Sequence, residues 1–99
     1  MQGGAGDEGG MQTPAAFVLK DDGVTPASRV VPAFIAVELR VDNRTSGLRR
    51  VVLRTRQQRV DFDVKAGEQA AVRIEGQPPG RYSIRFGKDQ EATLVARSE

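Results

Sequence analysis

The sequence contains no cysteine and no histidine. Without cysteine the chain can form neither a disulfide nor a thiolate, and without histidine it has no imidazole to act as a general base, a metal ligand or a charge switch near neutral pH. It also has no apolar run long enough to cross a membrane as a helix. These absences exclude thiol chemistry, histidine-dependent catalysis and metal sites built from thiolate or imidazole ligands.

Aromatic residues are scarce as well, with no tryptophan, one tyrosine and four phenylalanines in 99 residues. The core of the single domain that this length allows must therefore be mainly valine, isoleucine, leucine and alanine. The 15 lysines and arginines nearly balance the 13 aspartates and glutamates, which leaves a net charge of +2. Nucleic-acid binding needs clustered, uncompensated positive charge, so we expect no nucleic-acid partner.

The chain opens with the glycine-rich segment "MQGGAGDEGGMQ", residues 1–12, whose only charges are Asp7 and Glu8. Such a segment buries nothing, and we predict a flexible linker or tag. Two interpretations stay open: a cloning remnant, or a tether between a membrane anchor and a folded domain. Residues 13–99 are expected to form one domain, which would meet a membrane only through an anchor preceding the given sequence.

Alternation with a period of two runs through the chain from Thr13 onward, and no segment shows a helical period. It is clearest in "FIAVELRVDN", residues 34–43, where apolar side chains alternate with alanine and charged ones. This pattern predicts an antiparallel strand with one face in the core and one in water. Further strands are predicted over residues 16–20 and 49–55, while the segment around Pro26 and Pro32 suits a sheet edge.

We therefore predict an all-β fold, an antiparallel Greek-key β-sandwich of seven or eight strands. The side chains predicted to point inward are apolar or aromatic and lie at alternate positions. They are Phe17, Leu19, Ile35, Val37, Leu39, Val41, Val51, Leu53, Val60, Phe62, Val64, Val72, Ile74, Tyr82, Ile84 and Leu94.

The order and spacing of four segments carry a family resemblance: "VTPASRVVPAFIAVELRVDN" (24–43), "AGEQAAVRI" (66–74), "PPGRYSIRF" (78–86) and "ATLVA" (92–96). Together they resemble the cupredoxins, the plastocyanin-like copper proteins, over roughly residues 14–97. The resemblance implies a cupredoxin-like β-sandwich that ends in a hairpin, which in the family carries copper ligands.

This sequence departs from the family at each ligand position. Cupredoxins place a histidine soon after the asparagine that corresponds to Asn43, a cysteine near Phe86, and a histidine and a methionine in the next loop. Here residues 49–53 read "RRVVL" and residues 87–91 read "GKDQE". Type 1 copper needs a thiolate and two imidazoles, so we expect no metal and no cofactor. Phe86 is predicted to fill the space instead.

No catalytic constellation is evident. Asp61 and Asp63 lie two apart on an outward strand face, and Asp21 and Asp22 sit in a turn; a hard-cation site needs several converging oxygens, so we read both pairs as solvated. The serines have no histidine to activate them. The chain is therefore not expected to be an enzyme, and we assign no catalytic, cofactor-binding or metal residues.

The remaining candidate is an arginine cluster in "RRVVLRTRQQR", residues 49–59. Guanidinium groups suit carboxylate and phosphate recognition. The candidate anion-binding or partner-binding residues are Arg49, Arg50, Arg54, Arg56 and Arg59, with Arg54 and Arg56 expected on one strand face. The alternative is a solvated hairpin whose charge is partly balanced by Asp42, Asp61 and Asp63.

Two function classes follow. The first is a non-catalytic binding or adaptor module outside the cytoplasm, in the periplasm or at the cell surface, with a protein partner that the sequence does not identify. The second is a structural or assembly module that associates through a sheet edge. A copper carrier is disfavoured by the missing ligands.

Overall fold

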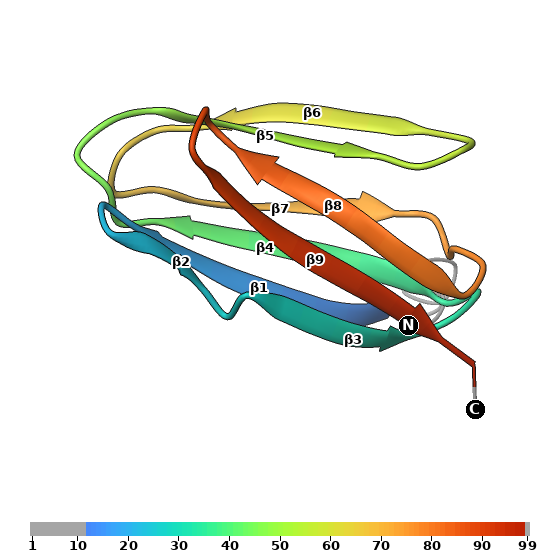
Figure 1. Ribbon diagram of the computed structural model, residues 1–99. Helices are drawn as coiled ribbons and strands as arrows, with labels where there is room; N and C mark the ends of the chain where they lie inside the picture. The colour runs from blue at the N-terminus through green and yellow to red at the C-terminus, as the bar shows by residue number, and fades with distance from the viewer. Residues whose placement is uncertain (1–11, 99) are drawn as a thin grey trace, which may run out of the picture.

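The computed structural model describes residues 12–98, which form two β-sheets packed face to face (Figure 1). The strands are β1 (Gln12–Lys20), β2 (Gly23–Thr25), β3 (Ser28–Pro32), β4 (Ala36–Asn43), β5 (Arg49–Arg54), β6 (Arg59–Val64), β7 (Gln69–Ile74), β8 (Gly80–Phe86) and β9 (Gln90–Arg97). The described residues contain no helix, and hence none that could cross a membrane. The predicted all-β sandwich is confirmed.

One sheet has the order β2-β1-β4-β7 and the other β3-β9-β8-β5-β6. Most neighbours are antiparallel, but β1 pairs with β4 and β3 pairs with β9 in parallel. The prediction that residues 34–43 form an antiparallel strand is thus correct for the pairing of β4 with β7 and wrong for its pairing with β1. Alternation shows that one face of a strand is buried, but it does not encode the direction of the neighbouring strand.

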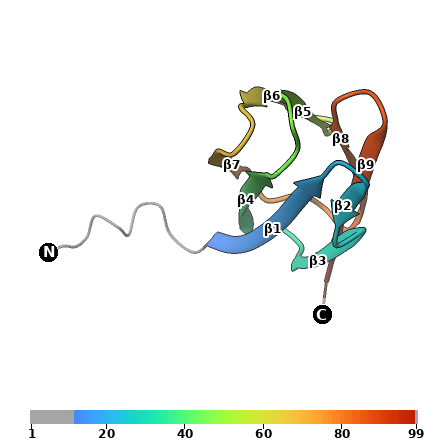
Figure 2. The same ribbon diagram turned by 90° about the vertical axis from the view of Figure 1, so that its left-hand side faces the viewer.

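The described residues form nine strands, where the alternation predicts seven or eight, because the segment around Pro26 contributes two. Before Pro26, β2 joins β1; after it, β3 joins β9 in the opposite sheet (Figure 2). The chain therefore changes sheets at a residue that cannot donate a ladder hydrogen bond. Residues 1–11 of the predicted linker lie outside the described part of the chain, and Gln12 is the first residue of β1.

Every side chain predicted to face inward, except Ile35, is buried in the core or packs against it. Ile35 is half-buried because the chain turns just before β4, where Phe34 has a φ of 67° and is 67% exposed. The backbone of Gly76 lies against this turn: a Cβ at Gly76 would come within 2.3 Å of the carbonyl carbon of Phe34. Only glycine permits so close an approach of two backbones.

The β1–β2 turn, the β4–β5 loop and the β8–β9 turn gather at one end of the sandwich, on the left in Figure 1. Asn43, which is fully buried at the end of β4, organises this end. Its Nδ2 donates to the carbonyl oxygens of Gly47 (3.0 Å) and Val64 (2.8 Å), and its Oδ1 accepts from the backbone N–H and the hydroxyl of Thr45. A buried amide with all these partners is stable, and it fixes the loop that leads into β5.

Candidate functional site

Phe86, at the position where the resemblance places a cysteine ligand, is 0% exposed and belongs to the core. Its ring packs against Phe17 of the opposite sheet, with centroids 5.8 Å apart and planes tilted by 48°. Tilted aromatic pairs at this distance add about 0.5–1.5 kcal/mol to the stabilisation from area burial. The burial of Phe86 shows that this apolar side chain is part of the core; that it fills the space of the family's copper site stays a prediction.

Above Phe86 lies an open hollow of about 500 Å³, lined at its edges by charged residues from the β1–β2 and β8–β9 turns. Asp21, Asp22 and Asp89 contribute carboxylates, and Arg49 and Lys88 contribute cations. The described residues contain no group of three or more side chains placed to hold a metal ion. This end of the sandwich thus presents mixed, solvated charge.

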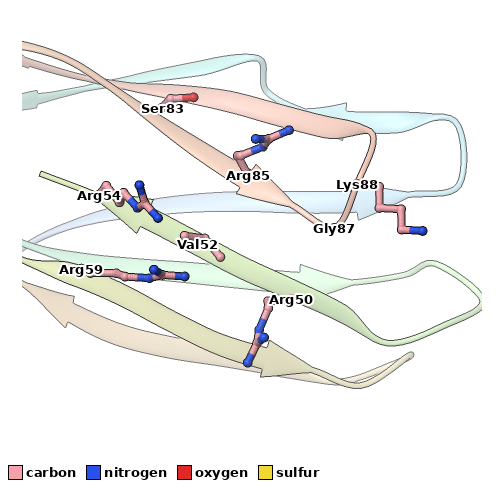
Figure 3. Close-up of a pocket in the computed structure, with 8 residues that line it drawn as sticks. All are labelled: Arg50, Val52, Arg54, Arg59, Ser83, Arg85, Gly87 and Lys88. Atoms are coloured by element: carbon pink, nitrogen blue, oxygen red, sulfur yellow. The ribbon is translucent and has the colours of Figure 1, made fainter.

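The main concentration of positive charge lies on the outer face of the five-stranded sheet. The charged side chains line a groove of about 590 Å³, which we call the basic groove (Figure 3). Its lining residues are Arg50, Val52, Arg54, Arg59, Ser83, Arg85, Gly87 and Lys88. Val52 lies in the middle of β5, with Arg50 and Arg54 on either side of it along the strand and Arg59 and Arg85 on the neighbouring strands.

The basic groove has its origin in the pairing of the strands. The β5–β8 ladder has only three register pairs, which end at Leu53 and Ile84, while β5–β6 has six and β8–β9 has seven. Beyond these three pairs β5 and β8 diverge, and β8 crosses the sandwich obliquely (Figure 1). The strong twist of the sheet therefore leaves a depression between two neighbouring strands.

Only part of the charge around the groove is balanced by carboxylates. Arg50 Nε lies 3.0 Å from Asp61 Oδ1 and 3.5 Å from Asp63 Oδ1, and Arg59 Nη2 lies 3.1 Å from Asp61 Oδ2. No described residue forms an ion pair or a hydrogen bond with the side chains of Arg54, Arg85 or Lys88. Within the described part of the chain, three cations of the groove thus have no partner and can meet solvent or a ligand.

The pairing register makes this imbalance sharper. Arg54 lies directly opposite Arg59 on β6. Arg85 lies directly opposite Glu91 on β9, yet the Glu91 carboxylate accepts a hydrogen bond from Ser83 and forms no ion pair with Arg85. Like charges in direct opposition are destabilising, and an unused opposite charge is a missed stabilisation, each by a few tenths of a kcal/mol.

Of the five arginines predicted from the sequence, the structure brings Arg50, Arg54 and Arg59 together in the groove. The other two lie elsewhere. Arg49 lines the hollow above Phe86 and donates to the Leu48 carbonyl oxygen (3.2 Å). β5 ends at Arg54, so Arg56 lies in the turn before β6, and the expectation that Arg54 and Arg56 share a strand face is wrong.

Sequence reasoning missed Arg85, Lys88 and Ser83, which line the same groove from β8 and the β8–β9 turn. The alternation of "GRYSIRF" does put Ser83 and Arg85 on the outward face, opposite Tyr82, Ile84 and Phe86. That signal is present in the sequence. The pairing of β8 with β5, which joins it to the arginine hairpin, is not.

No family model and no curated protein matches the sequence. Solved structures do match the fold. They include the reduced auracyanin of Roseiflexus castenholzii (TM-score 0.73, 9% identity, covering 89% of this chain and 99% of that one). They also include the metal-binding domain of the Cu(I)-exporting ATPase CopA of Streptococcus pneumoniae (0.73, 14%, 88% and 87%) and a purple cupredoxin of Nitrosopumilus maritimus (0.62, 9%, 84% and 99%).

At these identities the likeness shows the fold and nothing finer. It covers 84–89% of this chain in these three structures and agrees with the sequence resemblance. The chain lacks the cysteine and the histidines that type 1 copper requires, and Phe86 occupies the core at the cysteine position. The protein therefore has a cupredoxin-like fold without the family's copper ligands.

Proposed function

We propose that this protein is a non-catalytic binding or adaptor module that works outside the cytoplasm and binds an anionic partner through the basic groove. The observation that carries the proposal is the set of three cations, Arg54, Arg85 and Lys88, that have no acidic partner among the described residues. Since exposed charges are easily balanced by neighbours on a sheet, a local excess that costs stability suggests a binding role.

The solvated-hairpin alternative explains Arg50 and Arg59, whose charges are balanced by Asp61 and Asp63. It does not explain why Arg85 forms no ion pair with Glu91, the residue directly opposite it on β9. The groove also gathers its cations from separate segments, β5, β6, β8 and the β8–β9 turn, around one half-buried valine. These features favour a site over a merely solvated face.

The double variant Arg54→Gln/Arg85→Gln is expected to bind fluorescein-labelled hexaglutamate about tenfold more weakly, because it removes two exposed charged contacts that contribute roughly 0.2–1 kcal/mol each. Fluorescence anisotropy at low and at physiological ionic strength measures this, and the wild-type affinity should fall with salt. The melting temperature should stay unchanged or rise slightly, since the substitutions relieve the opposition of Arg54 and Arg59.

The matched control is Arg40→Gln/Arg44→Gln, which removes the same charge from two exposed positions, one within β4 and one just after it. Its affinity for hexaglutamate should stay within about twofold of the wild type, as expected for a change in net charge alone. Equal losses in the two double variants would contradict the proposal, because they would show attraction to the overall charge.

Copper binding is tested separately. Stoichiometric Cu(II) added to the untagged protein is expected to give no intense blue absorption and no rise in melting temperature, since a ligand that binds only the native state must stabilise it. Absorption spectroscopy and thermal unfolding with and without a chelator make the measurement. A shift that appears with copper and disappears with chelator would contradict this expectation.

Assembly through a sheet edge is the second candidate, and one observation favours it: Val30, in edge strand β3, is 52% exposed. Sedimentation velocity over a wide concentration range tests this candidate, because a monomer throughout would argue against assembly.

The compartment is tested by determining the N-terminus of the protein from its native host and by cell fractionation. Recovery in the cytoplasm with an unprocessed N-terminus would contradict the extracytoplasmic proposal.

A further inference from the structure

The spacing of the charges in the basic groove limits which class of ligand can bind there, an inference that rests on the proposed function. Arg50 and Arg54 are four residues apart on one strand, so their Cα atoms are separated by about 13 Å. Lys88 lies near the Arg50 end of the groove and Arg59 beside Arg54 (Figure 3). One small anion cannot reach both ends, so the ligand must be extended.

The middle of the groove is different in chemistry from its ends. Val52 is half-buried and lies between Asp61 on β6 and Arg85 on β8 in the pairing register. The aliphatic parts of the arginine side chains around it add further apolar surface, since arginine keeps only its guanidinium in water. A ligand that carries charge alone would leave this apolar surface around Val52 uncovered.

An extended peptide meets all of these constraints. Side chains at positions i, i+2 and i+4 of a strand point to the same side and span about 13 Å. A segment with the pattern acid–x–apolar–x–acid would therefore place one carboxylate at Arg54, the apolar side chain on Val52, and the second carboxylate at Lys88. Arg85 lies beside the central position and can donate to either carboxylate or to the peptide backbone.

Nucleic acid fits the groove less well. Proteins that hold single strands stack bases on aromatic side chains, and none of the residues that line the groove is aromatic. A phosphodiester backbone would also leave Val52 uncovered. We propose that the basic groove binds an extended acidic segment of a partner protein, with two carboxylates four residues apart and an apolar side chain midway between them.

The test is an NMR titration of the ¹⁵N-labelled protein, a method that detects weak complexes. The probe is the blocked peptide Ser-Glu-Ser-Leu-Ser-Glu-Ser, and the control peptide has serine in place of leucine. We expect the amide shifts of residues 50–54 and 83–88 to move on titration. The control peptide should bind roughly tenfold more weakly, because it loses the burial of one leucine.

Two protein variants separate the inference from the function on which it rests. Val52→Thr keeps the shape and β-propensity of the side chain but replaces one methyl group with a hydroxyl. It should weaken the binding of the leucine peptide about fivefold and leave the binding of the serine peptide unchanged. Arg54→Gln/Arg85→Gln should weaken both peptides.

Two outcomes would overturn the inference alone: equal affinity for the two peptides with no effect of Val52→Thr, or tighter binding of an oligothymidylate at the same amides. In either case the groove would remain an anion site. If Arg54→Gln/Arg85→Gln changed the binding of neither peptide nor hexaglutamate, the proposed function would fall together with the inference.

Discussion

Replacing Phe86 with alanine is expected to lower the free energy of unfolding by roughly 3–5 kcal/mol. The ring is fully buried and packs on Phe17 of the other sheet, so its removal deletes both the apolar burial and an aromatic contact, and it leaves a cavity between the two layers. Phe86 is also the last residue of β8, with a register partner, Val51, on one side and Gln90 on the other. The backbone is therefore held and cannot collapse to fill the space.

Urea unfolding followed by circular dichroism measures the loss as a shift in midpoint at constant slope. Two controls bracket it. Phe86→Leu keeps most of the apolar volume and should cost less than half as much, about 1.5 kcal/mol or less. Arg85→Ala, one residue earlier and pointing outward, should change the free energy by about 0.5 kcal/mol or less. If Phe86→Ala unfolded at the same urea concentration as Arg85→Ala, Phe86 would have no structural role at this end of the sandwich.

Much of the sandwich can be predicted from the sequence, because the burial of one face of a strand gives its apolar residues a period of two. β4 to β9 each carry this period, so their existence and their inward faces follow from the residues. The parallel pairings of β1 with β4 and of β3 with β9 do not, because a half-buried strand has the same pattern whichever way its neighbour runs.

The candidate site was only partly predictable for a related reason. Arg50, Arg54 and Arg59 are close in sequence, and alternation places them on an outward face. Arg85 is added only because β8 pairs with β5, a contact between residues 33 apart at Val52 and Arg85. Arg56 was wrongly grouped with Arg54 because the end of a strand is set by the turn that follows it, here the hydrogen bond from Thr55 N–H to the Gln58 carbonyl oxygen.

Replacing Leu39 with alanine is expected to cost roughly 2–5 kcal/mol, and the surroundings place the loss in the upper part of that range. Leu39 is 0% exposed in the middle of β4, with Ala15 of β1 and Val72 of β7 at its register positions. The side chain of Ala15 is a single methyl group, so it cannot extend into the cavity that the substitution leaves. Domains of this size are stabilised by only about 5–15 kcal/mol, so a large fraction of the stability is at stake.

The matched control for Leu39 is the next residue along the strand. Arg40 is exposed and pairs with Glu38 at 2.9 Å on the outer face, and Arg40→Ala should cost about 0.5 kcal/mol or less because such surface ion pairs contribute little. Should Leu39→Ala fail to fold, Leu39→Val provides a smaller cavity at the same position and a measurable loss. Equal losses for Leu39→Ala and Arg40→Ala would mean that the face of β4 assigned to the core is not the buried one. The register of β4 against β1 and β7 would then be wrong by one residue, since a slip of one residue exchanges the two faces of a strand.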